Sequence, residues 1–284
     1  MPTLTGADET TETPHLDLSF RRHPVHGTWL DRRVFRWPYT LSRGFRRDGD
    51  RLMLILQTMS GAIQADDRLV QRIHVGPRAA VHLATQGAMP VHRARVGRAA
   101  RDEIALHVGD RGSIEYMPDL RILFPGASLS QRVFLRLAES ATAIIADGFV
   151  MHDPEGRDRP FRQYSSEFLV QSPTGSVLAA DRMALVAPPG RCGKRGLYVA
   201  FGTLIVAVSR PIAWMEAFCA DADARLAQLA GVYAAASALP NGAGAAVRIA
   251  ATDGRHLRLG LQAGWSAARL HLSGCEARAN CWPA

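Results

Sequence analysis

Three acidic residues occupy places where a strand pattern ends or is otherwise apolar. Asp66 follows an apolar strand pattern and a short loop, and Asp147 follows the uncharged run 141–146. Glu115 is flanked by Ile114 and Tyr116. A carboxylate in such surroundings must find a partner or change its protonation state. Glu115 and Asp147 therefore either pair with arginines, which is the more common arrangement, or line a polar channel.

Asp66 is followed directly by Asp67. Two adjacent carboxylates after a loop can bind a hard cation or a basic partner. Aspartate is also a common turn residue, because its side chain hydrogen-bonds to the backbone a short distance along the chain. Both interpretations stay open, and the turn cap is the more common of the two.

Histidine is the other residue type here that suits a metal ion. Imidazole is a good ligand for nickel and zinc, and His74, His82, His92 and His107 all lie in the strand-rich first half. They fall on the polar faces of alternating strands, where a solvated or hydrogen-bonded histidine is usual. The pattern therefore favours scattered, transient metal contacts over a fixed site.

Signatures of catalysis are missing from the sequence. It contains no Gly-x-Ser-x-Gly elbow, no Walker loop and no dinucleotide fingerprint. The stretch 189–196 superficially resembles a phosphate loop but lacks the required spacing. The cysteines at 192, 219, 275 and 281 form no Cys-x-x-Cys pair and fit neither a zinc site nor a dense disulfide framework. We therefore expect a protein that is not an enzyme, in a reducing compartment.

The amino-acid composition indicates which kinds of partner molecule to expect. The chain has 284 residues and a net charge of +8, and Lys194 is its only lysine. A positive balance favours an acidic partner, whereas scattered arginines without an aromatic-plus-basic signature speak against nucleic acid. Residues 1–15 are polar and do not resemble a signal peptide, and the longest apolar run, 197–208, is too short to span a bilayer. We expect a soluble cytoplasmic protein that binds no membrane.

Period-two alternation dominates from Leu16 onward and predicts a large layered system of strands. Successive strand units of similar length indicate a stacked, coil-like array, and residues 1–15 are expected to be a disordered tail before a single β-rich domain at 16–284. About two helices are expected near the C-terminus: one from Pro211 to about Ala238, and a short one at about 261–272. The predicted strands are 68–75, 79–85, 102–108, 129–137, 162–170, 177–186, 197–208 and 246–251.

Several segments then match a known family in the same order along the chain. Residues 84–88 with 91–93 are similar to that family's Thr-Thr-Gln-x-Ala-x-Lys-Val-Tyr-Arg segment, and 114–118 with 122–127 to its Leu-Glu-Tyr-Leu-Pro and Ile-Pro-Phe-x-Gly-Ala segments. From about residue 16 to 274 the chain resembles the urease accessory protein UreD family, called UreH in some organisms. Later matches are Ala146-Asp147 to a Trp-Asp step, 201–204 to Gly-Thr-Leu, 237–244 to Leu-Pro-x-Gly-x-Gly and 247–248 to Val-Arg.

The resemblance implies a scaffold and no catalyst. Proteins of this family bind the accessory protein UreF and, through it, the GTPase UreG, and the assembly docks on apo-urease and helps insert nickel. The resemblance also implies a superhelical β-strand array with two helices and an internal tunnel for nickel. No cofactor is expected to be tightly bound, since nickel is in transit. Asp66, Glu115 and Asp147 are the residues expected along the nickel route, and Asp66 has the best motif match.

One motif departs from the family pattern. Where the family has a Gly-Gly-x-x-Gly-Gly-Asp loop, this chain has residues 60–66, in which only Gly61 and Asp66 agree. Glycine permits positive φ and close backbone approach, so its loss predicts a differently shaped loop. The alternative function is therefore a diverged UreD-like interaction module that serves another metalloenzyme or assembly.

Overall fold

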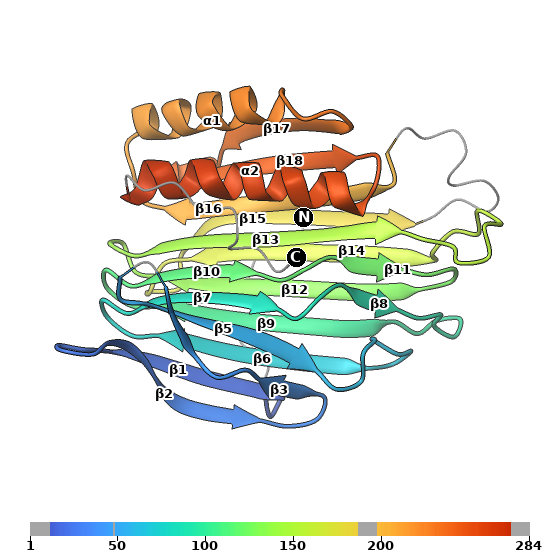
Figure 1. The fold of residues 1–284 in the computed structure, drawn as a ribbon, viewed down its shortest axis with the longest axis horizontal. Coiled ribbons are helices and arrows are strands. Elements are labelled where there is room, and N and C mark those ends of the chain that lie inside the picture. Colours follow the sequence, from blue (N-terminus) through green and yellow to red (C-terminus); the bar gives the residue numbers. More distant parts are fainter. Residues whose placement is uncertain (1–11, 48, 187–197, 274–284) are drawn as a thin grey trace.

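Two β-sheets stacked face to face form the body of the molecule (Figure 1). The computed structural model describes residues 12–47, 49–186 and 198–273. Sheet A contains, in spatial order, β15 (Val177–Val186), β14 (Gln163–Gln171), β12 (Ser128–Leu137), β9 (Ala100–Val108), β6 (Arg68–Val75), β1 (Leu16–His23) and β2 (Gly27–Phe35). Sheet B contains β17 (Val232–Ala238), β18 (Gly244–Ala251), β16 (Ala200–Val208), β13 (Thr142–Met151), β10 (Ser113–Met117), β7 (Ala80–Thr85), β5 (Arg51–Thr58) and β3 (Tyr39–Leu41).

The chain coils by changing sheet from one long strand to the next. Strands β6, β9, β12 and β14 run parallel in sheet A, and β5, β7, β10 and β13 run parallel in sheet B. Turns stack on one another, since the N–H of Arg78 donates to the carbonyl of Asp110 at 2.8 Å and that of Arg111 to Ser140 Oγ at 2.9 Å. The expected stacked strand array is confirmed. Three short strands complete sheet B: β4 (Phe45–Arg47), β8 (Met89–Val91) and β11 (Arg121–Leu123).

Period-two alternation places one set of side chains between the sheets. On β6, for example, Leu69, Ile73 and Val75 enter the buried core that the two sheets share. A second core lies on the outer face of sheet B, where helices α1 (Ile212–Leu226) and α2 (Gly254–Ser273) cover one end of the stack (Figure 1). There Phe218 and Trp265, both fully buried, pack with apolar side chains of β16 and β18.

The first predicted helix is too long. It ends at Leu226, and Val232–Ala238 is strand β17, paired antiparallel with β18. Gly231 separates the two with φ +73°, a conformation that ends a helix. The apolar residues predicted on one face of this helix are buried as far as Leu226. Tyr233, predicted on the same face, is 68% exposed. Pairing with the edge of β18 therefore overrides the helix propensity of this alanine-rich stretch.

The remaining strand predictions agree with the structure to within a few residues, whereas the second helix is longer than predicted. β6 has the predicted bounds, and α2 begins at Gly254 rather than near residue 261.

Of the expected tail, residues 1–11 lie outside the described part, whereas His15 donates its backbone N–H to the carbonyl of Val70 at 2.8 Å. The stretch 189–196 and Cys192, Cys275 and Cys281 also lie outside it. No helix among the described residues combines the length and apolarity needed to cross a membrane.

Candidate functional site

Glu115 lies on the outer face of sheet B, beneath α2. Because Ile114 and Tyr116 point into the core between the sheets, the strand alternation turns Glu115 toward the helix. Trp265 of α2 donates its indole N–H to Glu115 Oε2 at 3.2 Å. The carboxylate is therefore enclosed by sheet and helix together, and it is 3% exposed.

Three basic side chains surround this carboxylate. His82 Nδ1 lies 2.7 Å from Glu115 Oε2, Arg51 Nη1 lies 3.4 Å from Oε1, and Arg269 Nε lies 3.5 Å from Oε1. Burial raises the pKa of Glu115, but the hydrogen bond from His82 and the charges of Arg51 and Arg269 outweigh it and lower the pKa to about 2. Glu115 thus pairs with arginines, the first of its two expected arrangements.

A second polar group lies between the two sheets. Asp102 of β9 is fully buried, and its carboxylate accepts a bond from Arg121 Nη2 at 2.5 Å and one from Gln71 Nε2 at 3.4 Å. The hydroxyl of Tyr116 donates to Gln71 Oε1 at 3.2 Å. Burial alone would lower the pKa of Arg121, but the charge of Asp102 raises it, so the guanidinium stays charged beside the carboxylate.

Asp147 of β13 also points between the sheets. Gln131 Nε2 donates to its Oδ1 at 3.0 Å, and the hydroxyls of Tyr164 and Ser166 donate to its Oδ2 at 3.0 and 3.2 Å. All three of these donors are neutral side chains. Burial and the nearby carboxylate of Asp147 both raise the pKa of Tyr164, which keeps its hydroxyl protonated as a donor.

The strand register brings the two interior groups together. Asp102 pairs with Gln131 on the neighbouring strand, and Gln131 pairs with Ser166 on the next. Polar side chains thus continue from one group to the other along one level of sheet A, inside an otherwise apolar core. We call this row the polar strip; it comprises Gln71, Asp102, Tyr116, Arg121, Gln131, Asp147, Tyr164 and Ser166.

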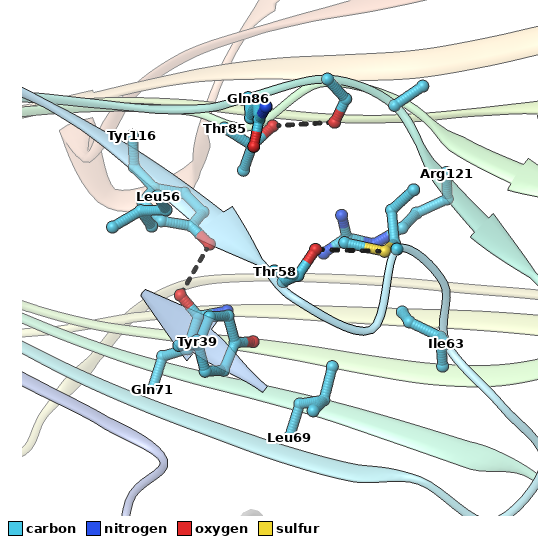
Figure 2. Close-up of a pocket in the computed structure, with 14 residues that line it drawn as sticks. Tyr39, Leu56, Thr58, Ile63, Leu69, Gln71, Thr85, Gln86, Tyr116 and Arg121 are labelled. Atoms are coloured by element: carbon cyan, nitrogen blue, oxygen red, sulfur yellow. Dashed lines mark hydrogen bonds between the residues drawn. The ribbon is translucent and has the colours of Figure 1, made fainter. Parts of the chain in front are cut away.

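A cavity lies at each end of the polar strip. The first, of about 340 Å³, is bordered by Tyr39, Gln71, Tyr116 and Arg121 and by the loops after β5 and β7 (Figure 2). Figure 2 shows the Tyr116 hydroxyl directed at Gln71 across this space. The second cavity, of about 370 Å³, is lined by Asp147 together with residues of β15, β16, β17 and β18. Asp147 thus lies where the polar strip reaches the second cavity.

Comparison with known proteins identifies the family of this chain. The model of the UreD urease accessory protein family matches residues 12–283. The chain belongs to the UreD family. It is 42% identical over 264 residues to urease accessory protein UreD 2 of Bradyrhizobium sp. (strain ORS 278), with 90% of each chain covered. It is 36% identical over 246 residues to urease accessory protein UreD of Mycolicibacterium smegmatis, with 85% of each chain covered.

The loop that departs from the UreD glycine pattern has positive φ at two positions. Gly61 and Asp66, the two positions that agree with the family, have φ of +65° and +68°. The Asp66 side chain pairs with Arg98 at 3.0 Å on the surface, and Asp67 Oδ2 accepts the N–H of Gln64 at 2.7 Å, so the turn cap is made by Asp67. Gly61 borders the first cavity, whereas Asp66 borders neither cavity.

The other expected metal contacts are dispersed across this UreD-family fold. His74 stacks on His107 in sheet A, His82 is bonded to Glu115, and the ring of His92 meets the edge of Phe124. Among the residues that the structure describes, no three histidines, cysteines or carboxylates converge on a metal position. Of the three acidic residues predicted along the nickel route, only Asp147 belongs to the polar strip.

Most of the polar strip was missed from the sequence. Asp102 and Gln131 stand at inward positions of their strands, where the alternation demands apolar residues, and this interruption is the signal that could have revealed them. Gln71 interrupts β6 in the same way. Arg121 could not be found by this rule, because β11 is only three residues long.

Proposed function

We propose that this protein is a non-catalytic scaffold for urease maturation in the cytoplasm. In this proposal it binds a UreF-like accessory protein and, through it, a UreG-like GTPase, and the complex docks on apo-urease and delivers nickel. Membership of the UreD family supports the role in urease maturation. The absence of a catalytic signature from the sequence supports a role in holding and transfer.

We further propose that nickel passes between the sheets along the polar strip. The supporting observation is that Asp147, which lies at the second cavity, receives hydrogen bonds from the neutral side chains of Gln131, Tyr164 and Ser166. One carboxylate with amide and hydroxyl oxygens gives a divalent ion a few weak ligands. Transit needs this weakness, because an ion must leave each position as readily as it arrives.

The proposed route retains Asp147 from the three predicted carboxylates and adds Asp102. Asp102 lies next to the first cavity through Gln71 and Arg121, and its charge is already matched by that of Arg121. Asp147 therefore supplies the negatively charged position of the proposed route. Glu115, held by three basic groups, and Asp66, paired with Arg98 at the surface, act in the fold instead.

Complementation in cells tests this function. A strain that lacks the gene and is supplied with nickel would receive the parent chain, the Asp147→Asn variant or the control Glu167→Gln. Glu167 lies on β14 beside Ser166 but faces outward, where it pairs with Arg132 and Arg182. The parent and the control should restore urease activity, and Asp147→Asn should restore about a tenth or less, the ratio that a 1.4 kcal/mol barrier produces.

Two results would contradict the proposal in different ways. Full urease activity without the gene would remove the maturation role. Full activity with Asp147→Asn would leave the maturation role in place and remove the nickel route.

A second candidate function is that of a UreD-like module for another client. One Bradyrhizobium strain, BTAi1, has both a UreD 2, 42% identical to this chain, and a UreD 1, 32% identical. This chain is therefore more similar to UreD 2 of that strain than to its UreD 1. Affinity purification from cells with two ureases, or with a urease and another nickel enzyme, would show which client accompanies the chain.

A further inference from the structure

Both sheets end at the same side of the molecule. Strand β2 is the last strand of sheet A and β3 the last of sheet B, and Figure 1 shows them together, opposite the end covered by the helices. The start of β2 is tied to the loop after β4, since Thr28 donates its N–H to the carbonyl of Asp50 at 3.2 Å. Residues of β2, β3 and β4 therefore form one continuous side.

Large aromatic side chains are exposed on this side. Phe35 lies on β2, Trp37 follows it, and Phe45 lies on β4, with exposed fractions of 41%, 64% and 40%. An isolated exposed apolar residue is ordinary, but several grouped together mark an interaction surface. Tryptophan in particular is enriched among the residues that dominate binding energy at protein interfaces.

The same side carries most of the excess positive charge. Residues 16–60 contain nine arginines and four aspartates, so this stretch holds +5 of the chain's +8. Three of the aspartates already have partners: Asp17 pairs with Arg32, Asp31 with Arg21 and Asp50 with Arg22. The surface is therefore basic after its internal pairs are formed.

Two further arginines lie over aromatic rings. The guanidinium carbon of Arg33 is 5.9 Å from the centre of the Phe35 ring, and that of Arg43 is 5.5 Å from the centre of the Phe45 ring. Both side chains are exposed. A guanidinium over a ring still has N–H groups available for a carboxylate. We call the surface of Arg33, Phe35, Trp37, Arg43 and Phe45 the basic edge.

We propose that the basic edge docks onto an acidic surface of a partner protein in the maturation assembly, with the aromatic rings as apolar anchors and Arg33 and Arg43 pairing with carboxylates. This proposal rests on the proposed function. A second copy of the chain is disfavoured, because two basic surfaces would repel each other. Nucleic acid is disfavoured because the exposed carboxylates of Asp31 and Asp50 lie among the arginines and would face phosphates.

Protection of the sheet edge is the competing explanation for these arginines. Charged residues on an edge strand do prevent unwanted strand pairing. Exposed tryptophan and phenylalanine rings have the opposite effect, since they add apolar area to the edge. Arginines that only protected the edge would not be expected beside three exposed rings, whereas an interface requires both.

Binding measurements on the full chain test the proposal. Purified apo-urease and the purified UreF-like protein would be titrated separately with the parent, the double variant Arg33→Glu/Arg43→Glu, Trp37→Ala and the control Arg255→Glu. Arg255 is exposed on α2, at the opposite end of the stack. Each titration would be made at low and at high salt, because charge pairing is screened by salt. A mixed-sequence single-stranded RNA is the third probe.

For one of the two proteins, the double variant should bind about tenfold or more weakly at low salt and lose most of the salt dependence. Trp37→Ala should weaken the same complex about 30-fold, as expected for a binding hot spot of 2 kcal/mol. Arg255→Glu should bind like the parent. Circular dichroism of each variant would verify that the fold is retained.

Three outcomes would overturn the proposal. If the parent binds and the variants bind equally well, the basic edge is not the interface, although the proposed function stands. If the parent binds neither protein, the proposed function fails as well. If only RNA binding responds to the double variant, the surface recognises nucleic acid.

Discussion

Glu115 and Asp147 show two environments for a carboxylate on the same sheet. Both lie on sheet B, but Glu115 faces the helices and Asp147 faces sheet A. Glu115 is enclosed by Arg51, His82 and Arg269, whereas the donors to Asp147 are an amide and two hydroxyls. The first carboxylate has its charge matched, and the second retains a charge that can attract a cation.

The two carboxylates differ both in their burial and in their partners, and the partners decide what each one joins. Glu115 joins α2 to sheet B, because two of its partners, Trp265 and Arg269, come from the helix. Asp147 joins no helix to the sheet, and it borders a cavity instead. The same residue type therefore supports the structure in one place and, in the function that we propose, serves ion transit in the other.

The largest expected difference between the two sites concerns stability. Glu115→Gln should lower the free energy of unfolding by about 3–5 kcal/mol, because it leaves Arg51 and Arg269 without their counter-charge in a largely buried place. Asp147→Asn should cost only about 1 kcal/mol, since neutral hydrogen bonds are exchanged. Chemical denaturation of both variants beside the parent measures this. Equal losses would break the distinction between the sites.

Acid should weaken the Glu115 site in a defined range of pH. The pKa of Glu115 is lowered from about 4.5 to about 2 on folding, so its contribution is fully present above pH 4.5 and is lost as the pH falls toward 2. The contribution amounts to about 3 kcal/mol. Unfolding measured over this range should show this loss in the parent and its absence in Glu115→Gln. An unchanged pH dependence in the variant would assign the acid sensitivity to other groups.

A smaller loss of stability is expected when the contact between Glu115 and α2 is weakened. Trp265→Phe removes the indole N–H that donates to Glu115 Oε2 and keeps most of the apolar contact. The expected cost is about 2 kcal/mol, the range for a hydrogen bond to a charged group. Hydrogen exchange should show faster opening of α2 than of the strands between the sheets. Uniform acceleration throughout the chain would show that α2 is not held separately.

The smallest expected effect on stability is at the surface. Asp66→Ala removes the pair with Arg98, which is exposed and is worth at most about 1 kcal/mol. Urease activation should be retained, because Asp66 borders neither cavity. Nickel loading measured with this variant checks the assignment, and a loss comparable to that of Asp147→Asn would return Asp66 to the nickel route.

The sequence predicted the elements whose pattern is local. Alternation defined β6, β9 and β12, because each has one face in the core between the sheets. It failed for β17, whose seven residues form a strand through pairing with β18. Family likeness, based on short motifs in order, agreed with the stacked architecture that the strand pattern indicated and added the expectation of a route for nickel.

The candidate site was predictable only in part, for a physical reason. Asp147 was found because it follows an uncharged run, and Asp102 and Gln131 could have been found as polar residues at inward positions. That these three residues meet depends on the strand register and on the facing of the two sheets. Neither is encoded in the pattern of a single strand.

The most direct test of the account is nickel transfer by purified components. The parent complex, Asp147→Asn and the outward-facing control Glu167→Gln would each be loaded with radioactive nickel and mixed with apo-urease, and the nickel bound per urease active site would be followed in time. The account predicts equal transfer by the parent and Glu167→Gln and transfer about tenfold slower by Asp147→Asn. Transfer at the parent rate by a folded Asp147→Asn complex would contradict it.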